Sequence, residues 1–227
     1  VLTMCGRFAG FRSLRELQES FPIDKAACEV TANYNVAPSQ EILAIIKHEG
    51  ENWLDKFHWG LVPFWAKDIS IGNRMINARS ETVAEKPSFR NAFKKRRCLI
   101  VADGFYEWKG EKGYKQPMFI TLPDRKPFAF AGLWETWNKK PDSDSIYKSC
   151  TIITTQASES FSEIHHRMPV ILNSEIYEPW LDLQNHDLDE LKKILKREII
   201  TELVSYPVSK QVNSASNNNP VCIEPIV

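Results

Sequence analysis

The sequence carries no excess of charge of either sign. Its 227 residues include 29 Lys and Arg and 29 Asp and Glu, so the formal net charge at pH 7 is zero. A strongly basic chain would by itself indicate nucleic-acid binding, and this chain offers no such argument. Any contact with DNA must therefore come from local basic groups, of which Arg74, Arg79 and the run Lys94–Arg97 are the candidates. The run is equally consistent with a solvated helix end.

The cysteine patterns of a disulfide framework or a zinc site are also missing. The five cysteines stand at positions 5, 28, 98, 150 and 222 and include no Cys-x-x-Cys pair. Their odd number and wide spacing fit a reducing compartment. The histidines and acidic residues show no zinc-type spacing, and there is neither a P-loop nor a dinucleotide fingerprint. We therefore expect no metal and no cofactor.

Long apolar segments are absent as well. No run approaches the roughly 18 residues that a membrane-spanning helix needs, and the N-terminus lacks the apolar region of a signal peptide. A content of 43% hydrophobic and 26% charged residues is ordinary for a globular protein. No internal repeat or linker divides the chain. We expect a single cytoplasmic domain that is monomeric and makes no membrane contact.

Three helices are predicted from capping residues that precede apolar stripes. Ser13 and Glu16 form a capping box for the first, Pro87 opens the second, and Asp187 caps the third. The second ends in the basic run, where the helix dipole favours cations. The apolar stripes consist of Leu14, Leu17 and Phe21 in the first helix, Phe89, Ala92 and Phe93 in the second, and Leu188, Leu191, Ile194, Leu195 and Ile199 in the third.

Much of the remaining chain predicts strands, because short β-branched or aromatic segments are bounded by Gly, Pro or Asp. Helices fall between blocks of strands and do not alternate with them, which favours an α+β fold over a doubly wound sheet. The Asn- and Ser-rich end, Asn213–Pro220, predicts a loop or an exposed tail. The predicted strands are Ile42–Ile46, Cys98–Ala102, Met118–Leu122, Phe128–Ala131 and Cys150–Thr155.

Five polar-aromatic segments stand out, yet each has an ordinary structural interpretation when it is taken alone. In the alternation of a strand, the Glu107 side chain can point outward, which is the commoner case, or into a cleft. Burial in a cleft among aromatic side chains would raise the pKa of Glu107 toward a value useful for acid-base catalysis. Taken singly, Cys5 is a small buried apolar residue, His165 a structural histidine, Asn77 a turn cap, and Trp59 and Trp65 core residues. The segments are Met4–Arg7, Trp59–Trp65, Asn77–Thr82, Asp103–Trp108 and Ile164–Val170.

Taken together and in this order, the five segments resemble the SOS-response-associated peptidase (SRAP) family. The motifs are Met-Cys-Gly-Arg, Trp-Gly-x-x-Pro-x-Trp, Asn-Ala-Arg-x-Glu-Thr, Asp-Gly-Phe-Tyr-Glu-Trp and Ile-His-x-Arg-Met-Pro, and the likeness continues to Pro225. The resemblance implies one α+β domain over residues 4–227, built on curved, largely antiparallel sheets with short peripheral helices. It also implies single-stranded DNA binding and a covalent reaction with abasic sites in the DNA damage response.

The resemblance further implies roles for individual residues. Cys5, the first residue once the initiator Met is removed, is expected to be the nucleophile, and Asn77 is expected to position it. Glu107 and His165 are expected to transfer protons. The resemblance places Arg7, Arg79 and Thr154 at DNA phosphates, and Pro38 and Trp65 as wedges between bases.

The chemistry of an N-terminal cysteine supports these expectations. Its amine can form an imine with the aldehyde of a ring-opened abasic sugar, and its thiol can then close a five-membered thiazolidine. An α-amino group has a pKa near 8, so a useful neutral fraction exists at pH 7. Ring opening and imine formation both need proton transfer, which suits an acid-base pair. Because an abasic site has no base, phosphate contacts and stacked aromatics suffice for recognition.

The sequence departs from the pattern at its start, because Val1, Leu2 and Thr3 precede Met4. If they remain, the Cys5 nitrogen is an amide and no thiazolidine can form. The favoured interpretation is that residues 1–3 are foreign to the mature chain or reflect a mis-assigned start. Self-cleavage before Cys5 and real divergence are the alternatives.

Two competing functions remain beside covalent capture. One is a cysteine peptidase with Cys5 as nucleophile and His165 as base, for which the sequence offers no clear oxyanion hole. The other is a non-catalytic single-strand-binding module with a structural Cys5. Imine chemistry can also proceed to β-elimination, so an abasic-site lyase activity is an expected side reaction.

Overall fold

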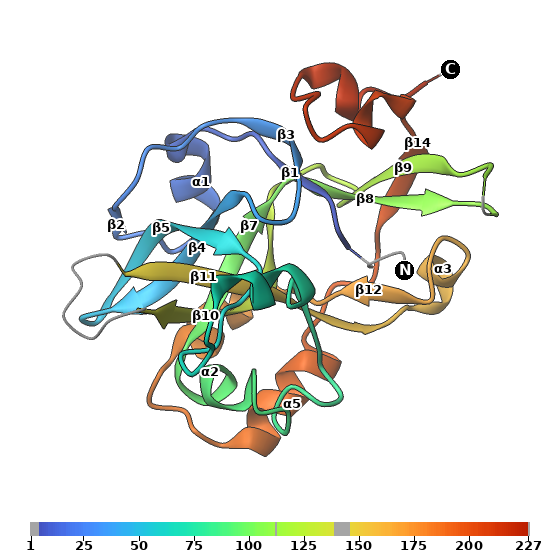
Figure 1. Cartoon of the computed structure of the whole chain (residues 1–227). Coiled ribbons are helices and arrows are strands. Elements are labelled where there is room, and N and C mark those ends of the chain that lie inside the picture. Colours follow the sequence, from blue (N-terminus) through green and yellow to red (C-terminus); the bar gives the residue numbers. More distant parts are fainter. Residues whose placement is uncertain (1–4, 112, 139–145, 227) are drawn as a thin grey trace.

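The computed structural model describes residues 5–111, 113–138 and 146–226, and it has an α+β architecture in which strands dominate (Figure 1). Most of the described strand pairs are antiparallel, and three are parallel. This arrangement confirms the predicted α+β class with largely antiparallel sheets.

The strands form two sheets. The smaller one has the order β14-β9-β8-β1-β3. The larger one has the order β12-β11-β10-β7-β4-β5-β2, with β13 added beside β10 and β6 beside β11. The smaller sheet consists of β1 (Phe8–Gly10), β3 (Asn33–Val36), β8 (Gly104–Lys109), β9 (Gln116–Thr121) and β14 (Val204–Pro207), and the larger one of β2 (Lys25–Ala26), β4 (Glu41–His48), β5 (Glu51–Trp59), β6 (Asn77–Arg79), β7 (Arg97–Ala102), β10 (Phe128–Trp137), β11 (Tyr147–Gln156), β12 (Arg167–Pro169) and β13 (Ile171–Leu172).

The larger sheet curls until it meets itself. Ser149 and Cys150 of β11 pair with His58 and Trp59 of β5, which closes β11, β10, β7, β4 and β5 into a ring. Closure removes the exposed edges that an open sheet of this length would present to other chains. The five predicted strands correspond to four strands of this ring and to β9. Each observed strand is longer than its predicted span, and β9 also ends one residue earlier than predicted.

Short helices surround the sheets. They are α1 (Leu14–Ser20), α2 (Arg90–Lys95), α3 (Glu159–Ser162), α4 (Tyr177–Leu181) and α5 (Leu188–Arg197), with 3-10 turns η1 (Ile69–Arg74), η2 (Ser174–Ile176), η3 (Lys210–Asn213) and η4 (Pro220–Ile223). The capping box of Ser13 and Glu16 is present at α1, and the Asp187 side chain caps α5. The second predicted helix begins at Arg90, three residues after Pro87.

The core is divided by the wall of the ring. Because strand side chains alternate between faces, Ile45 packs with the helices while its neighbours Ala44 and Ile46 pack toward the smaller sheet. The helix-side cluster includes Leu191 and Leu195, which confirms the predicted apolar stripe of α5. The other cluster joins the ring to the smaller sheet and contains Cys5.

The C-terminal segment packs over the outer face of the smaller sheet, as Figure 1 shows for η3 and η4. The buried Asn35 side chain donates hydrogen bonds to the carbonyl oxygens of Ser214 and Asn217, at 2.9 and 2.8 Å. Residues 213–220 therefore form a loop, as predicted, but the alternative of an exposed tail is wrong. Buried amide hydrogen bonds hold this polar segment in place where apolar packing cannot.

Candidate functional site

Cys5 and Glu107 meet between β1 and β8. The antiparallel register pairs Phe8 with Phe105, so the chain before β1 runs alongside the second half of β8. The backbone N–H of Cys5 donates a hydrogen bond to Oε1 of Glu107 at 2.8 Å. Cys5 is 0% exposed and Glu107 is 6% exposed. The outward position that strand alternation favoured for Glu107 is therefore wrong.

Glu107 is buried because both faces of β8 are covered. Phe105 packs toward the ring, while Tyr106 packs against the C-terminal segment with Val212 and Cys222. A strand with two covered faces gives no exposed position for a polar side chain, and the Glu107 carboxyl is held by a backbone donor. The cleft interpretation of this motif is the one that the structure supports.

Burial controls the protonation of both groups. Desolvation raises the pKa of Glu107 to about 7, although the Cys5 and Trp108 N–H groups and the nearby charges of Lys115 and His166 act to lower it. Burial also raises the pKa of the Cys5 thiol well above its usual value, and the Glu107 carboxylate adds to this rise. The thiol is therefore neutral at pH 7, while Glu107 can exchange a proton near that pH.

His165 lies in the turn between α3 and β12. Its Nδ1 accepts a hydrogen bond from the Arg167 N–H at 3.1 Å, and its ring stacks on His166 with centroids 4.3 Å apart. Partial burial lowers the pKa of His165, so its neutral form prevails at pH 7. Lys109 at the end of β8 pairs with Glu163, two residues before His165, at 3.4 Å, so this turn lies beside the strand that carries Glu107.

Asn77 and Arg79 lie on β6, which pairs in parallel with β11 so that Arg79 is opposite Thr154. Arg79 is exposed, Asn77 is partly buried and Thr154 is fully buried. Ile76, directly before Asn77, belongs to the same buried cluster as Cys5. The structure thus brings Cys5 and Glu107 into contact, and Ile76 and Ile164, which directly precede Asn77 and His165, pack in or against the cluster that contains Cys5.

Arg167 is a site residue to which the sequence analysis gave no role. Its guanidinium forms a bidentate pair with Glu81 at 2.9 and 3.0 Å and also donates to the Thr154 hydroxyl at 3.2 Å. The Thr154 side chain therefore faces Arg167 and not the surface. The arginine of the Ile-His-x-Arg motif was the available signal, but only the fold shows its link to β11.

Arg7 is partly buried beneath the C-terminal segment. Its Nη1 donates to Asn35 Oδ1 and to the Val212 carbonyl oxygen, each at 2.7 Å. Its guanidinium also lies over the Trp108 ring, 5.9 Å from the centroid. These contacts fix the orientation of Arg7 before any ligand binds, which reduces the entropy that a phosphate contact would cost.

The two expected wedge residues lie on neighbouring turns. Trp65 is 48% exposed, so its interpretation as a core residue is wrong, whereas Trp59 is 1% exposed and is a core residue. Pro38 is partly buried in a turn whose next residue, Ser39, donates its N–H to the Trp59 carbonyl oxygen at 2.9 Å. The end of β5 therefore anchors both turns.

A close backbone contact fixes the turn that carries Trp65. Gly60 has φ 136°, and a Cβ on it would lie 2.6 Å from the carbonyl oxygen of Gly72. Only glycine fits this approach between the end of β5 and η1. The contact holds the start of the segment that carries Phe64 and Trp65 against η1, and Trp137 Nε1 donates to the Ala66 carbonyl oxygen at its other end at 2.8 Å.

The basic run at the end of α2 is mostly occupied within the protein. Arg97 is fully buried and donates to carbonyl oxygens of Phe93, Lys94, Trp180, Asp182 and Asn185. Arg96 pairs with Glu135 at 2.7 Å. Both original interpretations of the run, DNA contact and solvated helix end, are therefore wrong for the buried Arg97, whereas Arg96 is partly buried in an internal ion pair. Lys94 and Lys95 remain exposed.

Over the described ranges, no three His, Cys, Asp or Glu side chains are arranged to hold a metal ion. The helices of the same ranges are too short or too polar to cross a membrane. Residues 1–4, which include the expected extra segment and Met4, lie outside the described residues.

Comparison with known proteins places this arrangement in a family. The profile of the SOS response associated peptidase (SRAP) family matches residues 4–215. The chain is 48% identical over 224 residues to the abasic site processing protein YoqW of Bacillus subtilis (strain 168). This match covers 97% of this chain and 99% of the relative. It is 35% identical to the abasic site processing protein HMCES of Gallus gallus, with 86% of this chain and 66% of the relative covered.

A solved structure of a protein from Bacteroides thetaiotaomicron is similar over the whole fold. The TM-score is 0.84 at 25% sequence identity, and the match covers 98% of this chain and 100% of that one. The family match spans nearly all of the chain, and the identities to two named relatives exceed 30% over most of its length. The chain belongs to the SOS response associated peptidase (SRAP) family.

Proposed function

We propose that this protein captures abasic sites in single-stranded DNA through a covalent thiazolidine crosslink to Cys5, in a mature form that begins at Cys5. The names of the relatives support an abasic site as the substrate. The observation that carries the proposal is the buried contact between the Cys5 nitrogen and the Glu107 carboxyl. In the sequence given, this nitrogen is an amide, and it stands in for the α-amine of the mature form.

The proposed reaction uses both reactive groups of an N-terminal cysteine. The α-amine attacks the aldehyde carbon of the ring-opened sugar, and the adduct loses water to give an imine. The Cys5 sulfur then adds to the imine carbon while the thiol proton moves to the nitrogen, which closes a five-membered ring. The net change is the loss of one water molecule.

Glu107 is suited to the proton transfers of this reaction. Its pKa of about 7 lies close to the pKa near 8 of a typical α-amino group, so the carboxylate can accept the ammonium proton and free the amine. The protonated carboxyl can then donate to the departing hydroxyl. In this proposal, the neutral His165 serves as the second proton carrier at ring opening, and Asn77 orients the reacting groups.

Four residues that are exposed or partly buried are suited to a DNA strand that is read without its bases. Arg79 and Arg7 provide cationic contacts for phosphates, and Trp65 and Pro38 stand on the two anchored turns as base wedges. Thr154 contributes through Arg167, whose guanidinium it holds.

Two features favour capture over a cysteine peptidase. Peptidase cysteines react as thiolates whose pKa is lowered by a neighbouring histidine or helix end, whereas burial raises the pKa of Cys5. Within the described chain, the hydrogen bonds of the His165 ring are to Arg167 and none is to Cys5. A lyase side reaction stays a prediction.

The test is covalent capture of single-stranded DNA that carries one abasic site. Protein beginning at Cys5 should give a heat-stable adduct whose mass equals protein plus DNA less one water. The Cys5→Ala variant should give none, whereas Cys28→Ala, which removes a half-buried cysteine away from Glu107, should react like the wild type. Equal adduct formation by Cys5→Ala would overturn the proposal.

A second preparation that retains Val1–Met4 tests the role of the amine. An acylated nitrogen cannot form the imine, so this form should give no heat-stable adduct, although alkylating reagents should still label its Cys5 thiol. A stable adduct on a chain that keeps its first four residues would show that another group, such as a lysine, forms the imine.

A further inference from the structure

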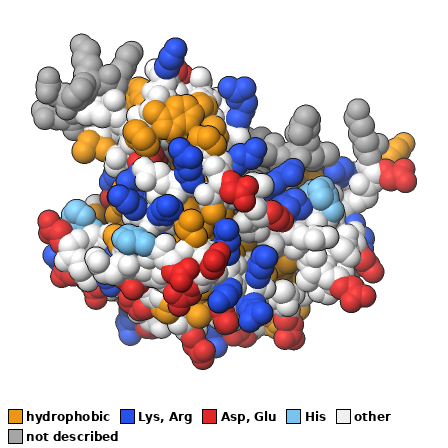
Figure 2. Space-filling model, turned by 90° about the horizontal axis from the view of Figure 1, so that it is seen from below, with side chains coloured by type: hydrophobic (Ala, Val, Ile, Leu, Met, Phe, Trp, Pro, Cys, Tyr) orange, Lys and Arg blue, Asp and Glu red, His pale blue; other side chains and the backbone are white. Residues whose placement is uncertain are grey.

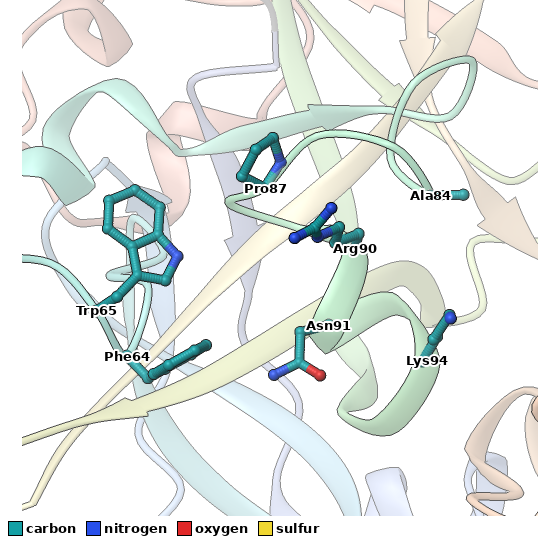
Figure 3. A pocket seen from close by; sticks show the side chains of 7 residues that line it. All are labelled: Phe64, Trp65, Ala84, Pro87, Arg90, Asn91 and Lys94. Carbon is teal, nitrogen blue, oxygen red and sulfur yellow. The ribbon is translucent and has the colours of Figure 1, made fainter.

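An open cleft of about 490 Å³ lies between the turn that carries Trp65 and helix α2. Figure 3 shows Phe64 and Trp65 on one side and Arg90 and Asn91 of α2 on the other. The volume lies within the roughly 300–1,000 Å³ range of ligand-binding clefts. The full lining is Phe64, Trp65, Ala84, Pro87, Arg90, Asn91 and Lys94.

We propose that this cleft is a nucleotide subsite that holds the DNA strand next to the abasic site, with a base against Phe64 and phosphates at Arg90 and Lys94. The inference rests on the function proposed above and adds to it the residues that hold a flanking nucleotide.

The aromatic wall of the cleft is available for stacking. Phe64 is 58% exposed and Trp65 is 48% exposed, which is unusual for adjacent large aromatic residues. The Gly60–Gly72 contact anchors the turn that carries them. Stacking on an aromatic ring is the main base contact of proteins that bind single strands without reading sequence, because every base has a flat face.

The opposite wall carries positive charge that is not used within the described part of the protein. Among the described residues, neither the Arg90 nor the Lys94 side chain forms an ion pair or a hydrogen bond, in contrast to Arg96 and Arg97 on the same segment. No acidic side chain lines the cleft. Two unpaired cations beside exposed aromatic rings fit a nucleotide better than an acidic peptide, which offers no base to stack.

The cleft is close in sequence to Arg79, one of the phosphate contacts of the proposed function. Its third wall includes Ala84, five residues after the exposed Arg79 of β6. Five residues span at most about 18 Å, and single-strand sites commonly cover several nucleotides, so one strand can contact both Arg79 and the cleft.

The experiment measures equilibrium binding of oligothymidylates that carry a tetrahydrofuran abasic analogue, which has no aldehyde. The analogue stays fixed while the strand is lengthened one nucleotide at a time on its 5′ side or its 3′ side. For the wild type, affinity should increase stepwise when one of the two arms reaches the cleft. Phe64→Ala should weaken binding about tenfold for strands beyond that step and leave shorter strands unaffected.

Charge variants give the second readout. Arg90→Ala and Lys94→Ala should each reduce the salt dependence of long-strand binding by roughly 0.7 in log–log slope, the value for one phosphate on a single strand. Lys95→Ala is the matched control, because Lys95 is exposed beside Lys94 but does not line the cleft. It should bind like the wild type.

The outcome separates the subsite from the proposed function. Two results would overturn the subsite while crosslinking to a short abasic strand proceeds normally and the proposed function stands. One is that affinity does not increase stepwise with strand length. The other is that the stepwise increase persists in Phe64→Ala, Arg90→Ala and Lys94→Ala. Occupation by a protein partner would give the same result. If no abasic strand of any length is captured, the proposed function fails instead.

Discussion

Glu107 shows at the scale of one residue how burial produces reactivity. In water this carboxyl would be ionised at pH 7, but the covered faces of β8 raise its pKa to about 7. The sequence could identify Glu107 as a candidate, because it stands among aromatic residues. It could not place Glu107 in a cleft, because alternation along a strand does not distinguish buried from exposed positions where both faces of the strand are covered.

Because the folded protein raises the pKa of Glu107, folding favours the protonated carboxyl. This contribution to stability is fully present below the ordinary pKa near 4.5 and is lost as the pH rises through about 7. Glu107→Gln is neutral at every pH and keeps an acceptor for the Cys5 N–H. We expect the wild type to lose about 3 kcal/mol of unfolding free energy relative to Glu107→Gln between pH 4.5 and pH 8.

Denaturant unfolding across this pH range measures the difference. Glu111→Gln, a change at an exposed position on the loop after β8, should follow the wild-type curve. Parallel curves of unfolding free energy against pH for the wild type and Glu107→Gln would show that burial does not raise the pKa of Glu107. The same Gln variant should crosslink slowly at all pH values, because it cannot exchange a proton.

At the scale of elements, local signals in the sequence were sufficient for some parts of the fold. The capping box of α1, the apolar stripe of α5 and the apolar strands of the ring follow from spacing and residue type alone. The parallel pairing of β5 with β11 does not, because it depends on residues about ninety positions apart. The β5 strand itself has charged residues such as Asp55 and Lys56 at half-buried positions, which obscured its pattern.

The basic run after α2 illustrates a second limit. Composition alone treats its four cations as equivalent, but only the fold reveals the carbonyl oxygens that converge on Arg97 from α2 and from the segment after α4. Burial lowers the pKa of Arg97 to about 10, and the hydrogen bonds to five carbonyl oxygens compensate for its lost hydration.

We expect Arg97→Met to destabilise the protein by about 3 kcal/mol or more, because it leaves several buried carbonyl oxygens without a donor. Chemical denaturation monitored by tryptophan fluorescence provides the measurement. Lys95→Met removes the same charge from an exposed position two residues earlier, at the end of α2, and should change stability by less than about 0.5 kcal/mol. Similar losses in the two variants would mean that the Arg97 hydrogen bonds contribute nothing specific.

At the scale of the whole molecule, zero net charge constrains the DNA binding that we propose. Basic and acidic side chains are interspersed on the face shown in Figure 2, so no broad positive field attracts DNA to this face from a distance. In the proposed function, binding therefore depends on a few short-range contacts made by arginines such as Arg7 and Arg79. The five ordered motifs allowed the family and these residues to be predicted from the sequence, whereas their partners, such as Val212 for Arg7, come from distant segments that only the fold brings together.

A small number of phosphate contacts predicts a modest dependence of DNA affinity on salt. Each contact contributes about 0.7 to the slope of log affinity against log salt for a single strand, so Arg79→Ala should lower the slope by roughly that amount. Affinity should also fall, to a similar degree for every flanking sequence, because a phosphate contact carries no base information. Arg15→Ala is the matched control, since Arg15 is exposed on α1 and pairs with Glu19, and it should leave the slope unchanged. Titrations of labelled single-stranded DNA at four or more salt concentrations measure both quantities, and an unaltered slope in Arg79→Ala would remove Arg79 from the proposed DNA surface.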